Sequence, residues 1–219
     1  MLASQIVNSG FPAINLFDKV SFALQLMDEY DVLHLPVLSE EKYAGLISKD
    51  DLLDLDETNL IASAEASLQN ISVKGDEYFL SALKLVAENE LSLLPVVNEQ
   101  SELAGVITAR DLIRRMSMFV GNEDRGGVIV LQTEKRNFSF GEINRLVETN
   151  DAYITQLNTH TEADTGLVVI TMKVNKIEIS DIIATFQRYE YVVRYYFGEE
   201  AYANELKENY NHLLSYLNM

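Results

Sequence analysis

The chain has 219 residues, of which 47% are apolar, and 34 acidic against 17 basic residues give it a formal net charge of −17. This length and composition allow one or two globular domains with a buried core. The charge disfavours nonspecific binding to nucleic acid or to an anionic membrane surface. The sequence has no cysteine, which excludes disulfides, a thiol nucleophile and thiolate metal sites and fits a reducing cytoplasm.

The first elements follow a lead-in over residues 1–11. We expect a helix from Asp18, as its N-cap, to about Tyr30, because apolar residues follow one helix face: Val20, Ala23, Leu24 and Met27. Strands are expected over 32–38 and 43–47. A short helix then starts at Ser48, and an alanine-rich linker with some helix covers 56–70. Pro36 has no backbone N–H, so it should lie at a sheet edge or where the ladder stops.

The same pattern returns about 60 residues later. Pro95 lies 59 residues after Pro36, whereas the turn 105–111 lies 60 residues after the turn 45–51. The second copy has therefore gained one residue in the turn between its proline and its glycine. The second copy predicts a strand near 71–73, a helix over 76–88, strands over 92–97 and 102–107, and a helix over 108–116. Such matching positions indicate an internal duplication.

The pattern changes after a boundary segment at 117–127. Strands are expected over 128–132, 152–161, 167–174 and 191–197, with helices over 140–150 and around 179–186. The order β-α-β-β-α-β is that of the split βαβ, ferredoxin-like arrangement. The last segment, 199–219, predicts an amphipathic helix with one apolar side: Leu206, Tyr210, Leu213, Leu214 and Leu217.

Two turns carry the candidate chemistry. Ser48 with Asp51, and Thr108 with Asp111, have the spacing of a helix-capping box. Both pairs could simply start helices. Alternatively, a helix N-terminus and a hydroxyl can bind a phosphate, while a carboxylate, which only accepts hydrogen bonds, can bind the two hydroxyls of a ribose. In that interpretation Gly45 and Gly105 let a ligand approach the backbone closely.

The two turns differ in charge. Arg110, Arg114 and Arg115 surround the second turn, and arginine suits a phosphate, although these residues could equally form a solvated helix face. The first turn has Lys49 among acidic residues that would repel an anion: Asp50, Asp51, Asp54 and Asp56. The sequence therefore favours the second turn for a charged nucleotide. The histidines show no metal-ligand spacing, and no catalytic motif is recognisable, so we expect neither a metal site nor catalytic residues.

The repeated helix, the Leu-Pro-Val strand and the Gly-x-x-[Ser/Thr]-x-x-Asp turn together resemble a tandem pair of cystathionine-β-synthase (CBS) domains. The resemblance implies an α+β fold with two β-α-β-β-α repeats, at 1–60 and 61–120. It also implies an adenine-nucleotide site in the cleft between the repeats, with a purine flanked by the apolar residues around the two prolines: Leu35, Pro36, Leu94 and Pro95.

The β-α-β-β-α-β unit at 126–198 is similar to an ACT domain, and its order behind a CBS pair resembles the acetoin-utilisation type of CBS–ACT protein. In amino-acid-binding ACT domains the first strand is followed by a glycine-rich turn with a proline. Here the turn at 133–141 has no proline, and its glycine, Gly141, is displaced towards the helix. A C-terminal helix at 199–219 completes the expected architecture.

The expected function is regulation without catalysis. The CBS pair would sense AMP, ADP or ATP without a required cofactor, in a cytoplasmic homodimer that acts on a regulated protein partner, with no role for nucleic acid or membranes. The alternative is a structural dimerisation or assembly module with vestigial nucleotide sites. An enzyme is a third reading that no motif supports.

Overall fold

The computed structural model describes residues 1–121 and 125–198. The chain divides into two compact units, Met1–Met116 and Ser117–Met219, and each is described by itself. The helix expected over 199–219 lies outside the described residues, as does the middle of the expected boundary segment, 122–124.

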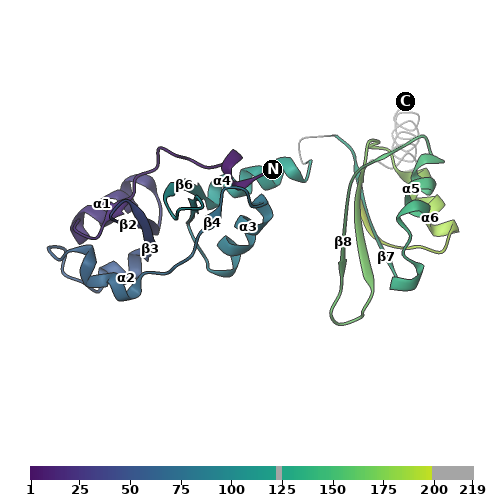
Figure 1. Ribbon diagram of the computed structural model, residues 1–219. Coiled ribbons are helices and arrows are strands. Elements are labelled where there is room, and N and C mark those ends of the chain that lie inside the picture. Colours follow the sequence, from purple (N-terminus) through teal and green to yellow (C-terminus); the bar gives the residue numbers. More distant parts are fainter. Residues whose placement is uncertain (122–124, 199–219) are drawn as a thin grey trace, which may run out of the picture. The chain divides into compact units, whose positions relative to one another are not determined.

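The first unit contains two copies of one motif (Figure 1). The first copy consists of β1 (Ile14–Asn15), α1 (Val20–Tyr30), β2 (His34–Ser39), β3 (Lys42–Ser48) and α2 (Lys49–Leu53). The second consists of β4 (Val73–Lys74), α3 (Phe79–Glu88), β5 (Leu93–Val97), β6 (Leu103–Thr108) and α4 (Ala109–Phe119). Each copy forms a three-stranded sheet, β1-β2-β3 or β4-β5-β6, with one parallel and one antiparallel pair. The predicted duplication is confirmed.

The prolines lie where the parallel ladder stops, as predicted. β2 is the middle strand of its sheet, and Pro36 pairs with Leu46 on the β3 side. On the other side, β1 begins to pair with β2 only at Val37, one residue after Pro36. The second copy repeats this arrangement, since β4 begins to pair with β5 at Val96. The missing N–H therefore costs the sheet no hydrogen bond.

The predicted starts of two helices were wrong. The N-cap of α1 is Lys19, and the Asp18 carboxylate instead accepts a hydrogen bond from the backbone N–H of Asn15 at 2.7 Å. In the second copy, Glu77 accepts from the N–H of Lys74 at 3.1 Å, and α3 begins only at Phe79. In both copies the carboxylate closes the turn between strand and helix rather than capping the helix.

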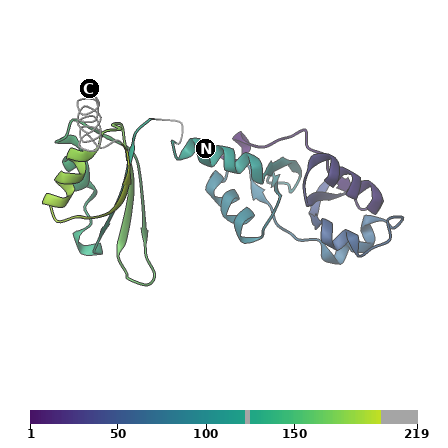
Figure 2. The ribbon, with the colours of Figure 1, turned by 180° about the vertical axis from the view of Figure 1, so that it is seen from behind.

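The lead-in segments cross between the two repeats. The backbone N–H groups of Ala3 and Asn8 donate to the carbonyls of Glu77 and Val106, at 2.9 and 2.8 Å. The N-terminal segment therefore lies beside the second repeat, as the purple ribbon near α3 and β4 shows in Figures 1 and 2. This long-range pairing ties the start of the chain to residues about 75 to 100 positions later.

The segment before the second repeat bonds to the first one in the same way. It forms the 3₁₀ helix η2 (Ile61–Ser67), whose first N–H donates to the carbonyl of Asp18 at 2.9 Å. Further on, Leu46 and Gln69 exchange two backbone hydrogen bonds of 2.8 and 2.9 Å. Residues 56–70 thus contain the expected helical part, but they pack on the first repeat instead of acting as a free linker.

One hydrophobic core joins the two repeats. The predicted helix faces contribute to it, with Val20, Ala23 and Met27 from α1 matched by Phe79, Ala82 and Val86 from α3. Leu24 and Leu83 are half-buried and pack against the same core. Because the core is shared, neither repeat buries its apolar surface alone.

The second unit has the predicted β-α-β-β-α-β order. Its elements are β7 (Gly127–Thr133), α5 (Phe140–Glu148), β8 (Ile154–Thr161), β9 (Val168–Val174), α6 (Ser180–Arg188) and β10 (Val192–Phe197). The sheet order is β10-β7-β9-β8 and every pair is antiparallel. Both helices cover one face (Figure 2), where the predicted apolar sets are buried: Ile143, Leu146, Val147, Val168, Ile170, Met172, Val174, Ile179, Ile182, Ile183 and Phe186. This is the ferredoxin-like arrangement.

In the parts of the chain that the structure describes, no helix combines the length and the apolar composition that crossing a membrane requires.

Candidate functional site

The second turn joins β6 to α4 through a hydroxyl–carboxylate pair. Thr108 Oγ1 accepts a hydrogen bond from the N–H of Asp111 at 3.1 Å and donates one to Asp111 Oδ2 at 2.6 Å. The N–H of Ala109 donates to the carbonyl of Ser92 at 2.9 Å. Thr108 and Asp111 are both half-buried, so their polar atoms are held in a fixed position at the surface. The predicted capping geometry is therefore present.

The first turn has the same geometry. Ser48 is the N-cap of α2, and its hydroxyl accepts from the N–H of Asp51 at 3.2 Å and donates to the Asp51 carboxylate. The N–H of Lys49 donates to the carbonyl of Leu33 at 2.8 Å, just as Ala109 does to Ser92. The two turns are thus equivalent in backbone and in side-chain hydrogen bonding.

A polar contact between the repeats lies next to both turns. The N–H of Leu33 donates to Ser92 Oγ at 2.9 Å, and the N–H of Ser92 donates to His34 Nδ1 at 3.2 Å. His34 pairs with Ser48 across β2 and β3, while Leu93, which follows Ser92, pairs with Thr108. The starts of β2 and β5, which pair with the ends of the strands that carry the two turns, are therefore joined by hydrogen bonds across the repeat boundary.

The His34 ring is held neutral by this environment. Burial lowers the pKa of His34 below its usual 6.5, and the nearby carboxylates of Asp50 and Asp51 only partly oppose that shift. Nδ1 lies 3.2 Å from the N–H of Ser92 and 3.1 Å from its hydroxyl oxygen, and when it accepts the hydrogen bond of this N–H, the neutral ring carries its proton on Nε2. The contact between the repeats consequently depends on the uncharged form of the histidine.

The cations of the two turns lie in different surroundings. Arg110 makes an ion pair of 3.1 Å with Asp31 of the first repeat, but the two side chains are 80% and 85% exposed. Water screens such a pair strongly, so Arg110 can exchange Asp31 for another anion at little cost. Lys49 makes an ion pair of 2.5 Å with Asp28 and is only 28% exposed. Lys49 is therefore less available to a ligand than Arg110.

Four residues expected to flank a purine are buried, which corrects their expected role. Leu35 and Leu94 are completely inaccessible to solvent, and Pro36 and Pro95 are also buried. Leu35 and Leu94 belong to the core that the two repeats share. In this conformation they present no surface to a ligand.

The structure also gives a different reason for the two glycines. A Cβ on Gly105 would lie 2.4 Å from the carbonyl oxygen of Asn8, and one on Gly45 would lie 2.8 Å from the Cβ of Leu68. The crossing lead-in segments occupy the space that we expected a ligand to use. Gly45 and Gly105 thus accommodate the chain itself.

Sequence reasoning missed His34, Ser92 and Asp31 as members of the region between the turns. Two of them had a usable signal, because Leu33 and Ser92 occupy equivalent positions 59 residues apart, directly before the Leu-Pro-Val strands. A polar residue at one such position and a histidine beside the other indicate a contact on the axis that relates the repeats. Asp31 gave no such signal, since its contact with Arg110 depends on the packing of the two repeats.

Comparison with known proteins agrees with this geometry. Residues 3–57 and 66–118 match the CBS domain family. These residues are therefore a tandem pair of CBS domains, which form the first unit of the chain. A CBS domain pair/ACT domain protein from Thermotoga maritima has a similar structure, with 26% identity and a TM-score of 0.51. The similarity covers 55% of this chain and 99% of that one.

Two groups of enzymes are among the curated relatives. Inosine-5'-monophosphate dehydrogenase from Methanocaldococcus jannaschii is 24% identical over 147 residues, which are 67% of this chain and 30% of the dehydrogenase. Homoserine O-acetyltransferase from Methanosarcina acetivorans is 24% identical over 119 residues, which are 51% of this chain and 21% of that enzyme. This chain spans less than a third of the length of either enzyme.

Proposed function

We propose that this protein is a non-catalytic regulatory module whose CBS pair binds an adenine nucleotide, AMP, ADP or ATP, at the turn of Thr108 and Asp111. The observation that carries the proposal is the half-exposed hydroxyl–carboxylate pair at the start of a basic helix, beside the contact between the repeats.

The carboxylate of Asp111 suits a ribose. The Thr108 hydroxyl uses only Oδ2, and among residues 1–121 and 125–198 no group donates a hydrogen bond to Oδ1. A carboxylate oxygen of this kind can accept hydrogen bonds from the hydroxyls of a ribose. Asp111 would therefore orient the nucleoside without repelling the phosphate, which lies further away on the ligand.

The arginines suit the phosphate. The Thr108 hydroxyl has one proton, which it already donates in a hydrogen bond to the Asp111 carboxylate. The N–H groups of Ala109 and Asp111 already have acceptors as well. Little of the helix N-terminus is left for an anion, so the positive charge must come mainly from side chains. Arg110 and Arg114 are exposed on the first turns of α4 and can supply it.

Regulation would follow from the position of the site between the repeats. A ligand shifts a conformational equilibrium only if it binds one arrangement more tightly than the other. A nucleotide at Thr108 and Asp111 lies next to the His34–Ser92 contact, so it can favour one arrangement of the strand ends.

The two groups of related enzymes support a non-catalytic role for this chain. The dehydrogenase and the acetyltransferase catalyse different reactions, and each resembles this chain over a minor part of its own length.

We further propose a cytoplasmic homodimer with a regulated protein partner, in which the second unit acts as an ACT-like domain. Leu53 of α2 and Ile113 of α4 occupy equivalent positions in the two repeats and are 61% and 68% exposed. Such a matched apolar pair supports self-association through the CBS pair. The ferredoxin-like sheet order supports the ACT-like assignment.

A structural assembly module with vestigial sites is the second candidate. It is favoured by the internal bond between each hydroxyl and its carboxylate, which satisfies both groups without a ligand. In that case the two turns do no more than start their helices, with a contribution of about 0.5–2 kcal/mol each.

Thermal unfolding with AMP, ADP and ATP distinguishes the two candidates. At a ligand concentration of about 100 times Kd, binding stabilises the native state by about 2.7 kcal/mol. We expect this increase with at least one nucleotide in the wild type and in Asp51→Ala, and its loss in Asp111→Ala. If no nucleotide stabilises the wild type, the assembly module is the correct interpretation.

A further inference from the structure

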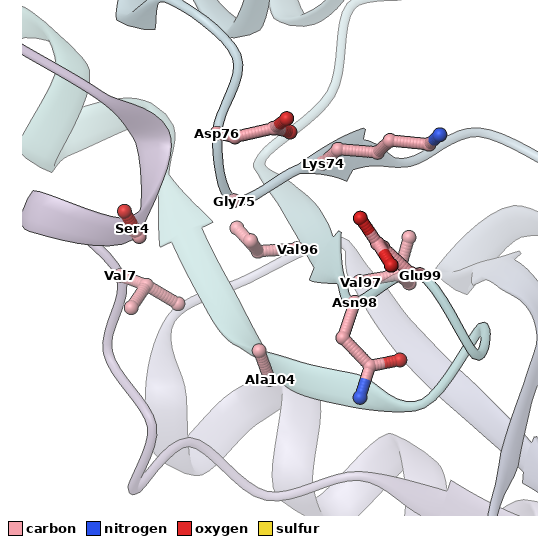
Figure 3. A pocket seen from close by; sticks show the side chains of 10 residues that line it. All are labelled: Ser4, Val7, Lys74, Gly75, Asp76, Val96, Val97, Asn98, Glu99 and Ala104. Atoms are coloured by element: carbon pink, nitrogen blue, oxygen red, sulfur yellow. The ribbon is translucent and has the colours of Figure 1, made fainter.

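An apolar cavity of about 250 Å³ lies at the other end of the second repeat's sheet, away from the Thr108 turn. Ala104, on its wall, is near the start of β6, whereas Thr108 ends that strand. Figure 3 shows Ser4 and Val7, from the N-terminal segment, facing Val96 of β5 across the cavity. The crossing lead-in therefore forms one wall of this cavity and the second repeat forms the other.

The first repeat has a leucine where the cavity opens. Leu16 and Gly75 occupy equivalent positions, because their N–H groups donate to the carbonyls of Leu38 and Val97, both at 3.3 Å. Their carbonyls accept from the crossing segments in the same way, at 2.8 Å from Ala62 and 2.9 Å from Ser4. Leu16 is half-buried and packs against the core. The duplication therefore replaces an aliphatic side chain with empty space at Gly75.

The backbone does not require glycine at position 75. Gly75 is not among the residues with a positive φ. A Cβ there would lie 3.4 Å from the Cβ of Ser4 and 4.0 Å from Cγ1 of Val96, which are ordinary contacts. Gly75 thus differs from Gly105, whose Cβ would meet the backbone of Asn8 at 2.4 Å. Neither the backbone conformation nor close packing therefore explains the glycine at position 75, and its effect on the structure is to leave the cavity open.

We propose that the cavity beside Gly75 binds a small ligand through a branched aliphatic group of the size of a leucine side chain. Val7, Val96, Val97 and Ala104 supply the apolar walls. Burial of such a group is favourable because it removes apolar surface of both ligand and protein from water. The rim carries both signs of charge, Lys74 against Asp76 and Glu99, so it can contact a head group of either sign.

Methyl NMR of the full chain tests the site with three probes that share one branched chain: isovalerate, isoamylamine and isoamyl alcohol. We expect saturable shifts of the methyl signals of Val7, Val96, Val97 and Ala104 with at least one probe. The probe that binds most tightly identifies the preferred head group, anionic, cationic or neutral. The absence of any saturable shift at these methyl groups in the wild type would overturn the proposal.

The other repeat supplies matched variants. In Gly75→Leu the new side chain fills the cavity, so the shifts should disappear, and in Gly75→Ala they should weaken. Leu16→Gly should create an equivalent cavity in the first repeat and add a second set of shifts near Leu38. Unchanged shifts in a folded Gly75→Leu protein would show that the probes bind elsewhere, and would also overturn the proposal. None of these results depends on nucleotide binding at Asp111.

Discussion

The two turns of the CBS pair have the same hydrogen bonds and opposite charges. In each, the hydroxyl of the last residue of a strand caps a helix and donates to a carboxylate three residues on. Asp50 stands beside the carboxylate in the first turn and Arg110 stands at the equivalent place in the second. The helices differ as well, because α2 has five residues and α4 has eleven.

The fold requires the features that the two turns share, whereas a charged ligand would distinguish the turns by their different charges. A serine or threonine cap with its carboxylate is explained by the start of a helix in either repeat. Nothing in the cap requires arginines on one helix and aspartates on the other. The difference in charge is therefore the better guide to the nucleotide site, and the following variants test it.

The largest effect is expected from the glycines that the crossing segments cover. Gly105→Ala places a Cβ against the backbone of Asn8 at 2.4 Å, at a φ of 143°, which L residues rarely adopt. We expect it to lower the free energy of unfolding by about 3 kcal/mol or more. Gly45→Ala meets the Cβ of Leu68 at 2.8 Å and the carbonyl oxygen of Gln69 at 3.3 Å, which is a less severe overlap, and should cost less.

Urea unfolding of the two variants measures this difference. The stability of the CBS pair should fall in the order wild type, Gly45→Ala, Gly105→Ala. Equal stability of Gly105→Ala and the wild type would mean that the N-terminal segment does not lie against β6.

Exchanging the charges of the equivalent residues Asp50 and Arg110 should shift nucleotide binding from the second turn towards the first. Arg110→Asp should weaken ATP binding about tenfold or more, which corresponds to about 1.4 kcal/mol, because a phosphate then meets a carboxylate. The loss of the exposed ion pair with Asp31 should itself change stability by less than about 1 kcal/mol. Asp50→Arg should instead strengthen binding at the first turn.

Isothermal titration with ATP at low and high salt checks the exchange. A weaker salt dependence in Arg110→Asp would identify the guanidinium as a phosphate contact. If the variant binds ATP as the wild type does, the arginines of α4 are a solvated helix face.

The smallest effect concerns His34. The pKa of His34 in the folded state lies below 6.5, its usual value in the unfolded chain. At a pH between the folded-state and the unfolded-state pKa, the unfolded chain binds more protons, so the free energy of unfolding falls as the pH decreases. Above about pH 7.5 the ring is neutral in both states and contributes no slope. In the variant His34→Gln, the glutamine amide can accept the hydrogen bond of Ser92 without titrating. This variant should therefore lose less stability than the wild type between about pH 7 and 5.5.

Chemical denaturation across this range, with the wild type as reference, gives the difference. Asp50 and Asp51, whose carboxylates lie near the His34 ring, are unchanged in the variant, so the two proteins differ only at position 34. Parallel pH profiles would show that the neutral histidine does not support the contact between the repeats.

Much of the fold could be predicted because its signals are local. The spacing of Val20, Ala23 and Met27 predicted a helix face, and the order of elements in the second unit predicted its ferredoxin-like sheet. The crossing of the lead-in segments could not be predicted in this way. It depends on backbone hydrogen bonds between distant residues, such as Asn8 and Val106, and these bonds leave no signal in the identity of the side chains.

The candidate site was predictable to the same extent. The pairs Ser48–Asp51 and Thr108–Asp111 followed from their spacing, because a helix cap is a local structure. The expected purine contacts of Leu35 and Leu94 did not follow, because an apolar strand residue can face a cleft or a core, and the shared core buries both. The contact of His34 with Ser92 needed the packing of the repeats.

The stoichiometry of nucleotide binding tests the central claim most directly. Calorimetric titration of the wild type with the nucleotide that stabilises it should give one nucleotide per chain, with one in Asp51→Ala and none in Asp111→Ala. Two equal sites per chain would show that the equivalent hydrogen bonds, and not the charges, determine binding. Binding that is lost in Asp51→Ala and kept in Asp111→Ala would contradict the account.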